Sequence, residues 1–273
     1  MQPIPEQADI SAFRETGVLF PIEVLSTAEI STALGALQLI ELAPAAIRKS
    51  LLAHKSHLVS RTFNDLIRHP KILQTIERIL GPNILVWGSD FFVKEPGTPN
   101  FVSWHQDAAY WGLTPDDIVT AWVALTPSTI ASGCLEVIPG THIEPVMPHT
   151  NTFASENMLS RGQTIEARPQ ASQALYVELA PGQMSIHHVK IAHASGPNQS
   201  ASRRIGFAIR YIAAHVRQMR DIVDSATLVQ GLNVPGNFAL EPSPAGELLP
   251  ADIAFHQVTW RTEQQIIAAS DKG

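Results

Sequence analysis

The stretch Trp104-His105-Gln106-Asp107 decides how this sequence is interpreted, because it places an imidazole and a carboxylate two residues apart. On a β-strand, side chains at positions i and i+2 point to the same face of the sheet. If residues 102–107 form a strand, His105 and Asp107 can therefore converge on one point. The preceding Glu95-Pro96-Gly97 predicts a turn that begins a new segment of chain before this strand.

A second histidine, His193, follows about ninety residues later and is the preferred partner of this pair. It stands at the end of a predicted strand, and Ala-Ser-Gly-Pro-Asn after it is typical of a turn at the rim of a sheet. His187 and His188 precede it in the same predicted strand and remain alternatives. Two imidazoles and one carboxylate form the facial ligand set of non-haem Fe(II) enzymes, which leaves coordination positions open for a co-substrate and O₂.

Arg204 lies eleven residues beyond His193, on the next predicted strand. Its planar guanidinium can bind a carboxylate through two parallel hydrogen bonds, which a lysine cannot do. Arg203 is its neighbour, and only one of the two can face inward on a strand. Ser195 can add a hydroxyl donor to the same carboxylate. Each residue alone is equally compatible with a solvated polar group, but the combined set predicts a dicarboxylate beside a metal.

The composition describes an ordinary globular protein with a sizeable core, since 45% of its 273 residues are hydrophobic and 16% are charged. Twenty prolines and sixteen glycines favour a β-rich body. The net charge is −6 and no cluster of Lys and Arg occurs, so we expect no nucleic-acid partner. No apolar run reaches the roughly 18 residues of a membrane span, so we expect no membrane partner either.

Cys134 is the single cysteine and excludes an internal disulfide bond. This usage fits the reducing cytoplasm. The first residues lack the basic and apolar regions of a secretory signal, so we expect a cytoplasmic location.

The order of sequence patterns predicts helices first and strands afterwards. Ser26-Thr27-Ala28-Glu29 has the spacing of a capping box at a helix start, and a second helix is predicted from Asn64 to Leu80. Strands follow, including one over 184–193. Residues 143–172 are predicted to be a long polar loop that acts as a lid or binding loop. The tail after 217 is expected to hold one or two short helices.

No linker is evident, so we expect one domain over residues 1–273. It comprises a helical part at about 1–82, a core at about 84–215 and a C-terminal extension at about 216–273. The expected fold class is mainly β (α+β): a double-stranded β-helix or jelly-roll, cupin-like core with an N-terminal helical buttress. His54, His57 and His69 lie in the helical part and are expected at the surface, and His142 is expected in a turn.

The chain resembles the phytanoyl-CoA dioxygenase family of Fe(II)/2-oxoglutarate-dependent oxygenases over roughly residues 10–215. The matching stretches are Glu15-Thr16-Gly17-Val18-Leu19-Phe20, Trp104-His105-Gln106-Asp107, Thr120-Ala121-Trp122-Val123-Ala124-Leu125, Ser132-Gly133-Cys134-Leu135, Pro139-Gly140-Thr141-His142 and His193-Ala194-Ser195-Gly196-Pro197-Asn198 with Arg204. Ala194 departs from the glycine that is usual in relatives, which is a change of one methyl group.

The resemblance implies that His105, Asp107 and His193 bind iron. It also implies that Arg204 pairs with the distal carboxylate of 2-oxoglutarate, with Ser195 beside it and Trp122 packed against the co-substrate. The expected cofactors are Fe(II), with 2-oxoglutarate and O₂ as co-substrates. The expected reaction is hydroxylation of an aliphatic carbon of a small-molecule metabolite, with release of succinate and CO₂. Relatives that chlorinate carbon have a small residue in place of Asp107, so hydroxylation is favoured.

Tyr110, Trp111, His188 and Arg210 are expected on the substrate side, together with the loop at 143–172. Arg210 suggests an anionic or zwitterionic substrate, although an ion pair within the protein explains it equally well. One alternative function is a non-catalytic jelly-roll module that binds a small molecule. Another is a zinc hydrolase, although the sequence lacks a His-Glu-x-x-His helix. The oligomeric state is not predicted.

Overall fold

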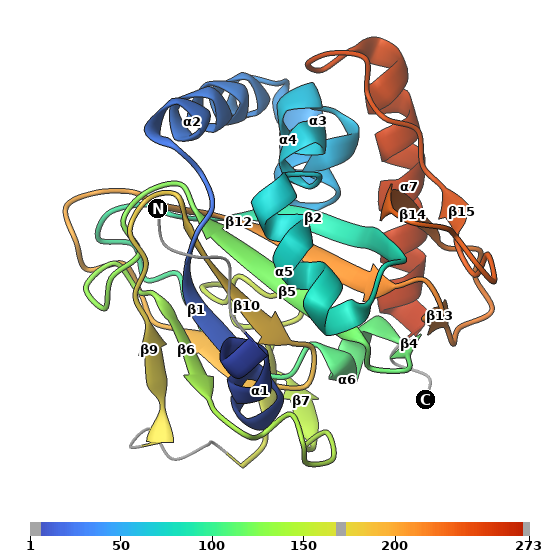
Figure 1. Cartoon of the computed structure of the whole chain (residues 1–273). Helices are drawn as coiled ribbons and strands as arrows, with labels where there is room; N and C mark the ends of the chain where they lie inside the picture. Colours follow the sequence, from blue (N-terminus) through green and yellow to red (C-terminus); the bar gives the residue numbers. More distant parts are fainter. Residues whose placement is uncertain (1–6, 168–172, 270–273) are drawn as a thin grey trace. The chain divides into compact units, whose positions relative to one another are not determined.

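Two larger β-sheets are built from the chain in a computed structural model that describes residues 7–167 and 173–269 (Figure 1). The first sheet has the strand order β1-β10-β5-β12-β2-β14-β15, and the second has the order β3-β11-β6-β9. Two sheets of short, mostly antiparallel strands match the predicted jelly-roll class.

The first sheet consists of β1 (Val18–Glu23), β10 (Gln183–His188), β5 (Ile118–Ala124), β12 (Arg204–Ala213), β2 (Ile84–Lys94), β14 (Ser225–Gln230) and β15 (Ala239–Leu240). The second consists of β3 (Val102–His105), β11 (Ala192–Ser195), β6 (Leu135–Ile138) and β9 (Leu175–Val177). Two separate pairs are β4 (Leu113–Thr114) with β13 (Arg217–Gln218), and β7 (His149–Asn151) with β8 (Gln163–Ile165).

The helices are α1 (Gln7–Thr16), α2 (Thr27–Glu41), α3 (Ala45–Ala53), α4 (Arg61–Leu66), α5 (Pro70–Leu80), α6 (Ala108–Trp111) and α7 (Pro250–Ala269), with a 3₁₀ turn at Ser56–Leu58. The predicted capping box is confirmed, since Ser26 Oγ accepts from Glu29 N and Ser26 N donates to the Glu29 carboxylate at 2.7 Å. The single helix predicted over 64–80 is wrong. The chain forms α4 and α5 instead, and Pro70 begins α5 because the first helical position needs no N–H donor.

By its internal contacts the chain divides into two compact units. The first contains Met1–Val24, Phe92–Ala109 and Trp122–Gly206, and the second contains Leu25–Phe91, Tyr110–Ala121 and Phe207–Gly273. The single domain expected from the sequence remains a prediction.

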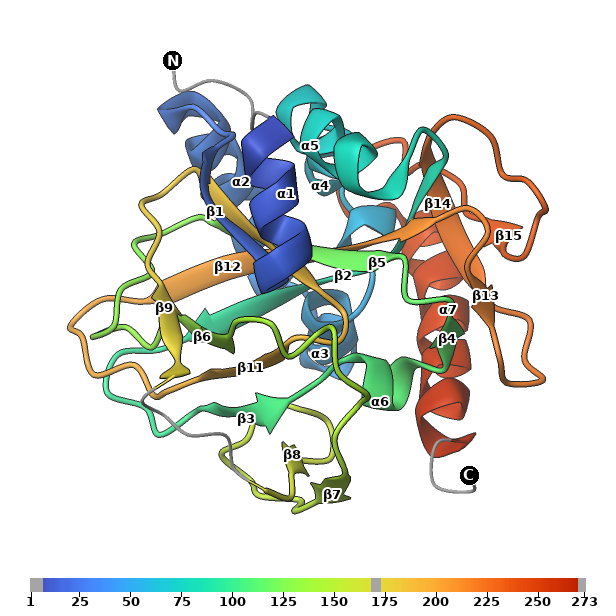
Figure 2. The ribbon, with the colours of Figure 1, turned by 60° about the horizontal axis from the view of Figure 1, so that its bottom comes forward.

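In the first unit, the strands β3, β11, β6 and β9 lie side by side (Figure 2). Trp104, Ile138, Ile165, Ala192 and Ala194 form a buried cluster on this sheet. Ile165 belongs to β8, within the segment predicted to be a polar loop. That prediction is therefore wrong for residues 149–151 and 163–165, which pair as the strands β7 and β8, and β8 contacts β3. The last five residues of the predicted loop, 168–172, lie outside the described residues.

Two predicted strands of this unit end elsewhere than expected. β3 stops at His105, so Asp107 lies in the turn that leads into α6. The strand predicted over 184–193 is two strands, β10 and β11, which belong to different sheets. The expectation that His187 and His193 share one strand is therefore wrong.

In the second unit, the rings of Phe63, Phe91 and Phe207 meet with centroids 4.8–4.9 Å apart. The tail differs from expectation, because it contains three strands and the 20-residue helix α7. His54 and His57 are buried rather than at the surface. None of the helices in the described residues combines the length and apolar character that a membrane span requires.

Candidate metal centre and co-substrate site

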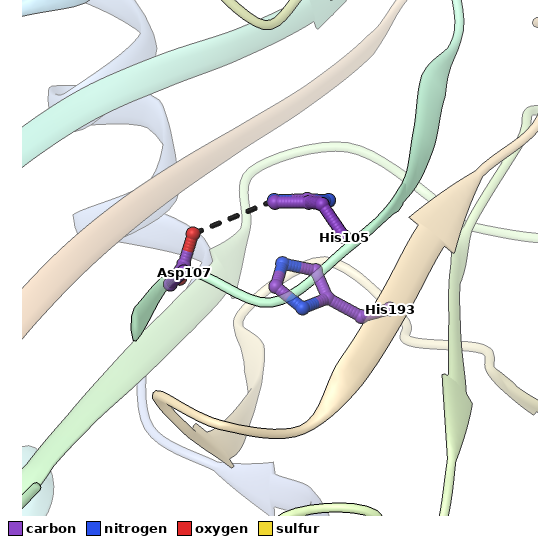
Figure 3. A group of neighbouring side chains, drawn as sticks. All are labelled: His105, Asp107 and His193. Atoms are coloured by element: carbon purple, nitrogen blue, oxygen red, sulfur yellow. Dashed lines mark ion pairs between the residues drawn. The ribbon is translucent and has the colours of Figure 1, made fainter. Parts of the chain in front are cut away.

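The register of two neighbouring strands brings the proposed ligands together. β3 and β11 run antiparallel, and His105 pairs directly with His193. Side chains of such a pair leave the sheet on the same face, and the two imidazole centroids are 4.0 Å apart. Asp107 faces them from the turn after β3 (Figure 3). One donor atom from each of the three residues lies within 4.8 Å of the others.

In both histidines, Nδ1 is used in a hydrogen bond, which leaves Nε2 to bind a metal. Nδ1 of His105 lies 2.9 Å from the carbonyl oxygen of Ser103, and Nδ1 of His193 lies 3.0 Å from that of Ile191. A carbonyl oxygen only accepts, so each Nδ1 carries the proton and each Nε2 presents a lone pair when the ring is neutral. Ligating histidines in metal sites are oriented in this way.

Two further observations fit a bound cation. Nε2 of His105 lies 3.4 Å from a carboxylate oxygen of Asp107, and two lone pairs at this distance need a proton or a metal ion between them. Burial, together with the charge of His105, lowers the pKa of His193 well below its usual value, so its ring is neutral as a ligand must be. His187, one of the predicted alternatives, has its ring centroid 4.8 Å from that of His193.

Hydrogen bonds of Gln106 fix the turn that contains Asp107, and the sequence did not indicate them. The backbone N–H of Gln106 donates to Nε2 of His149 at 3.0 Å. The Gln106 side chain donates to the carbonyl of Lys190 at 2.6 Å and accepts from the N–H of Met147 at 2.8 Å. Gln106 thus ties the ligand turn to two distant segments. Because these partners lie 41 to 84 residues away, no local pattern shows them.

Arg204 lies at the start of β12 in a buried position with only 2% of its surface exposed. Its guanidinium carbon is 5.3 Å from the ring centroid of Trp122, within the range of a cation–π contact. Nε and Nη2 have no hydrogen-bond partner among the described residues. Buried donors are nearly always paired, so these two donors fit a ligand carboxylate. Burial lowers the pKa of Arg204 to about 10, which leaves it charged at neutral pH.

Ser195 lies at the end of β11, where its hydroxyl donates to the carbonyl of Gly133 at 2.7 Å. The same oxygen accepts from Nζ of Lys94 at 2.5 Å. Gly133 has a φ of +69°, and a side chain there would collide with the backbone of Gly196. Lys94 was not predicted, since a lysine at the end of an apolar strand carries no distinctive signal.

The predicted substrate residues fall into both units. In the first, the rings of His188 and His142 are tilted by 56° with their centroids 5.2 Å apart, and Nδ1 of His188 accepts from the N–H of Lys190. In the second, the ring of Trp111 lies 5.2 Å from that of Trp87 and 5.2 Å from the Arg210 guanidinium.

Arg210 donates twice to Asp90, at 2.8 and 3.0 Å, which is the internal ion pair considered as the alternative. The carbonyl of Tyr110 accepts from Arg220 at 2.9 Å.

The family profile of phytanoyl-CoA dioxygenase matches residues 13–206, which include all three candidate ligands and Arg204. The chain belongs to the phytanoyl-CoA dioxygenase family. A probable α-ketoglutarate-dependent hypophosphite dioxygenase of Stutzerimonas stutzeri is 34% identical over 161 residues, which cover 58% of this chain and 55% of that protein. A 1-deoxypentalenic acid 11-β-hydroxylase of Streptomyces exfoliatus is 31% identical over 51% of this chain and 52% of its own length. The matched part thus spans about half the length of these curated relatives.

Among solved structures, the non-haem monooxygenase ThoJ in its apo form superposes with a TM-score of 0.87 and 32% identity, over 96% of this chain and 98% of that one. This similarity confirms the predicted fold class. At the level of the family, the predicted class of Fe(II)- and 2-oxoglutarate-dependent oxygenase and its cofactors are confirmed as well.

Proposed function

We propose that this protein is an Fe(II)/2-oxoglutarate-dependent dioxygenase that hydroxylates an aliphatic carbon of a small-molecule metabolite. The observation that carries this proposal is the convergence of two imidazoles and one carboxylate within 4.8 Å, in the same unit as a buried arginine with unpaired donors. A metal ion and a dicarboxylate together account for both features.

His105, Asp107 and His193 would hold the iron, and Arg204 would bind the distal carboxylate of 2-oxoglutarate. When bound, iron and 2-oxoglutarate couple decarboxylation of the co-substrate, which gives succinate and CO₂, to insertion of one oxygen atom from O₂ into a C–H bond. Trp122 would flank the co-substrate and exclude water from the arginine. Gln106 would hold the ligand turn in place while the open metal positions are used.

The carboxylate of Asp107 favours hydroxylation over halogenation. A halide would need the metal position that this side chain is placed to fill. The expected prime product is therefore an alcohol.

We propose an anionic or zwitterionic substrate, with Arg210 as a candidate contact. Arg210 is neutralised by Asp90, so an anionic group would compete with that carboxylate. Tyr110, Trp111 and His188 remain proposed substrate contacts, and the cytoplasm remains the proposed location.

The two alternative functions have less support. A binding module without catalysis needs no facial ligand set beside an arginine with unpaired donors. A zinc hydrolase needs a carboxylate as general base in addition to the ligands, and Asp107 already serves as a ligand in this arrangement. Activity with Zn²⁺ in the absence of O₂ would favour the hydrolase.

The first experiment is an anaerobic titration of the Fe(II)-loaded protein with 2-oxoglutarate. Chelation of the metal by the 2-oxo acid gives a visible metal-to-ligand charge-transfer absorption, and we expect this band for the wild type. His105→Ala and Asp107→Ala should lose the band because each removes one of three ligands. His215→Ala is the matched control, since His215 is an exposed histidine paired with Asp117, and it should behave as the wild type.

A screen of zwitterionic, anionic and uncharged metabolites for substrate-stimulated succinate release then tests the substrate class. Stimulation by amino-acid-like compounds, carboxylates or phosphonates supports this substrate class, whereas stimulation only by uncharged compounds contradicts it. If the wild type gives no charge-transfer band, the oxygenase proposal itself is wrong.

A further inference from the structure

Lys94, the last residue of β2, is completely buried in the first unit. Its ammonium group donates to the carbonyl oxygen of Ser195 at 3.1 Å, to Oγ of Ser195 and to the carbonyl oxygen of Gly196. These three contacts use all three N–H donors of a lysine. All three acceptors are uncharged and belong to the turn that begins two residues after the ligand His193.

A second set of hydrogen bonds joins the chain after β11 to the end of β2. The side chain of Asn198 donates to the backbone carbonyl of Lys94 at 3.0 Å, and the N–H of Gly97 donates to the carbonyl of Asn198 at 2.9 Å. The end of β2 and the end of β11 are therefore joined through both side chain and backbone. The hydroxyl of Ser195 is held between Nζ of Lys94 and the carbonyl of Gly133.

The charges around Lys94 do not balance in the protein alone. The charged and titratable groups that act on it are Arg204 on β12, Glu136 on β6 and Cys134 just before β6. Arg204 is also buried, and it has two donors without a partner among the described residues. Among the described residues no carboxylate is hydrogen-bonded or ion-paired to either cation. Two buried cations with uncharged partners favour an added anion.

We propose that Lys94 is a positioning residue of the co-substrate site, which holds Ser195 at the end of β11 and adds a second positive charge beside Arg204, so that the site selects a 2-oxo acid with a distal carboxylate. This inference rests on the proposed function and deepens it. Lys94 acts through Ser195 and through its charge, since its own donors are already occupied.

The protonation of Lys94 supports the same conclusion. Burial, together with the charge of Arg204, lowers the pKa of Lys94 to about 7, and Glu136 opposes the shift. Below pH 7 the group is charged and attracts the distal carboxylate, and above pH 7 it loses its proton and this attraction. Binding of 2-oxoglutarate is therefore coupled to uptake of a proton, and affinity falls as the pH rises.

The test compares two probes on the anaerobic Fe(II)-loaded protein, by calorimetry and by the charge-transfer band. 2-Oxoglutarate has the distal carboxylate, and pyruvate has only the chelating 2-oxo acid. Lys94→Met keeps the length of the side chain and removes the charge. It should raise the Kd for 2-oxoglutarate roughly 10- to 100-fold, as expected for loss of a charge-assisted interaction, and change the Kd for pyruvate less than about threefold.

Lys94→Arg is the second variant and keeps a charge at all accessible pH values. In the wild type the Kd for 2-oxoglutarate should rise about tenfold between pH 6.5 and 8.5, whereas in Lys94→Arg it should stay nearly constant. This comparison remains decisive if Lys94→Met does not fold. The melting temperature and the Fe(II) affinity of each variant show whether the fold and the metal site are intact.

The outcomes separate the two proposals. If the wild type binds neither probe, the proposed function is wrong. If the wild type binds 2-oxoglutarate but Lys94→Met binds it equally well, or loses affinity for both probes alike, the assignment of Lys94 is overturned. A Kd of the wild type that does not vary with pH also contradicts it.

Discussion

At the scale of single residues, Gly206 sets the position of the Trp122 indole. A Cβ atom at residue 206 would lie 1.7 Å from Cζ2 of Trp122, far inside van der Waals contact. The guanidinium of Arg204 lies over the Trp122 ring in a cation–π contact. One absent methyl group therefore determines where the guanidinium of Arg204 lies.

Gly206→Ala should destabilise the protein by about 1–3 kcal/mol, because the buried indole must move to make room. It should also weaken binding of 2-oxoglutarate, since Arg204 loses its support. Urea unfolding and the anaerobic titration measure the two effects.

Gly35→Ala is the matched control for that substitution. Gly35 lies in α2 with nothing within 4 Å of an added Cβ, so alanine should stabilise the helix by about 0.5–1 kcal/mol. If Gly206→Ala and Gly35→Ala both change the free energy of unfolding by a small and equal amount, the Trp122 indole is not tightly packed.

Residues of the candidate site were predictable where the chemistry is local. His105 and Asp107 stand two positions apart, and His193 precedes a turn signature. The reason given for their convergence was partly wrong, because Asp107 follows the strand and approaches the two imidazoles from a turn. Lys94 and His149 were missed, since their roles depend on partners 43 to 102 residues away in sequence.

At the scale of elements, α7 is joined to the C-terminal end of α3 by two buried histidines, His54 and His256. Nε2 of His256 donates to the carbonyl of His54 at 2.6 Å, and Nδ1 of His54 lies 2.9 Å from the carboxylate of Glu263. Burial, with the nearby charge of His54, lowers the pKa of His256 from 6.5 to about 4. The docking of α7 is therefore sensitive to acid.

The sign of this effect follows from proton binding. Between pH 6.5 and about 4, His256 is neutral in the folded protein and protonated in the unfolded chain, so the unfolded state gains protons as the pH falls. The stabilisation is complete above pH 6.5 and is lost progressively down to about pH 4. That interval corresponds to roughly 3 kcal/mol for a single group.

His256→Gln keeps a donor for the carbonyl of His54 and removes the titration. We expect the free energy of unfolding of the wild type to fall more steeply than that of the variant between pH 6.5 and 4.5. Urea unfolding at several pH values measures both slopes. Parallel curves would show that His256 does not titrate with folding.

Whole elements were predictable in proportion to how local their signals are. The capping box at Ser26 located the start of α2, because its two hydrogen bonds join residues three apart. The separation of β10 from β11 was missed, since both are apolar runs and only their sheet partners distinguish them. Helix was expected in the tail, but the 20-residue length of α7 was missed, because its apolar positions show only weak helical periodicity.

At the scale of the whole molecule, all three candidate ligands, Arg204 and Lys94 lie in one of the two compact units. A ligand that binds only the folded state stabilises it by about 2.7 kcal/mol at 100 times its Kd. Anaerobic addition of Fe(II) and 2-oxoglutarate should therefore raise the melting temperature by several degrees.

Scanning calorimetry measures this shift and also tests the predicted single domain. One domain should give a single transition that moves as a whole, and removal of the metal with EDTA should reverse the shift. Asp107→Ala should show no shift. Two separate melting transitions, of which only one shifts when Fe(II) and 2-oxoglutarate are added, would contradict the prediction of a single domain.

The chain passes between the two compact units five times, after residues 24, 91, 109, 121 and 206. Consequently, no truncation from either terminus yields one unit whole, and no exchange of a single contiguous gene segment with a relative replaces one without cutting into the other. Recombination that redesigns the substrate side must therefore graft short stretches individually, and directed evolution by point substitution is the more practical route to a new specificity.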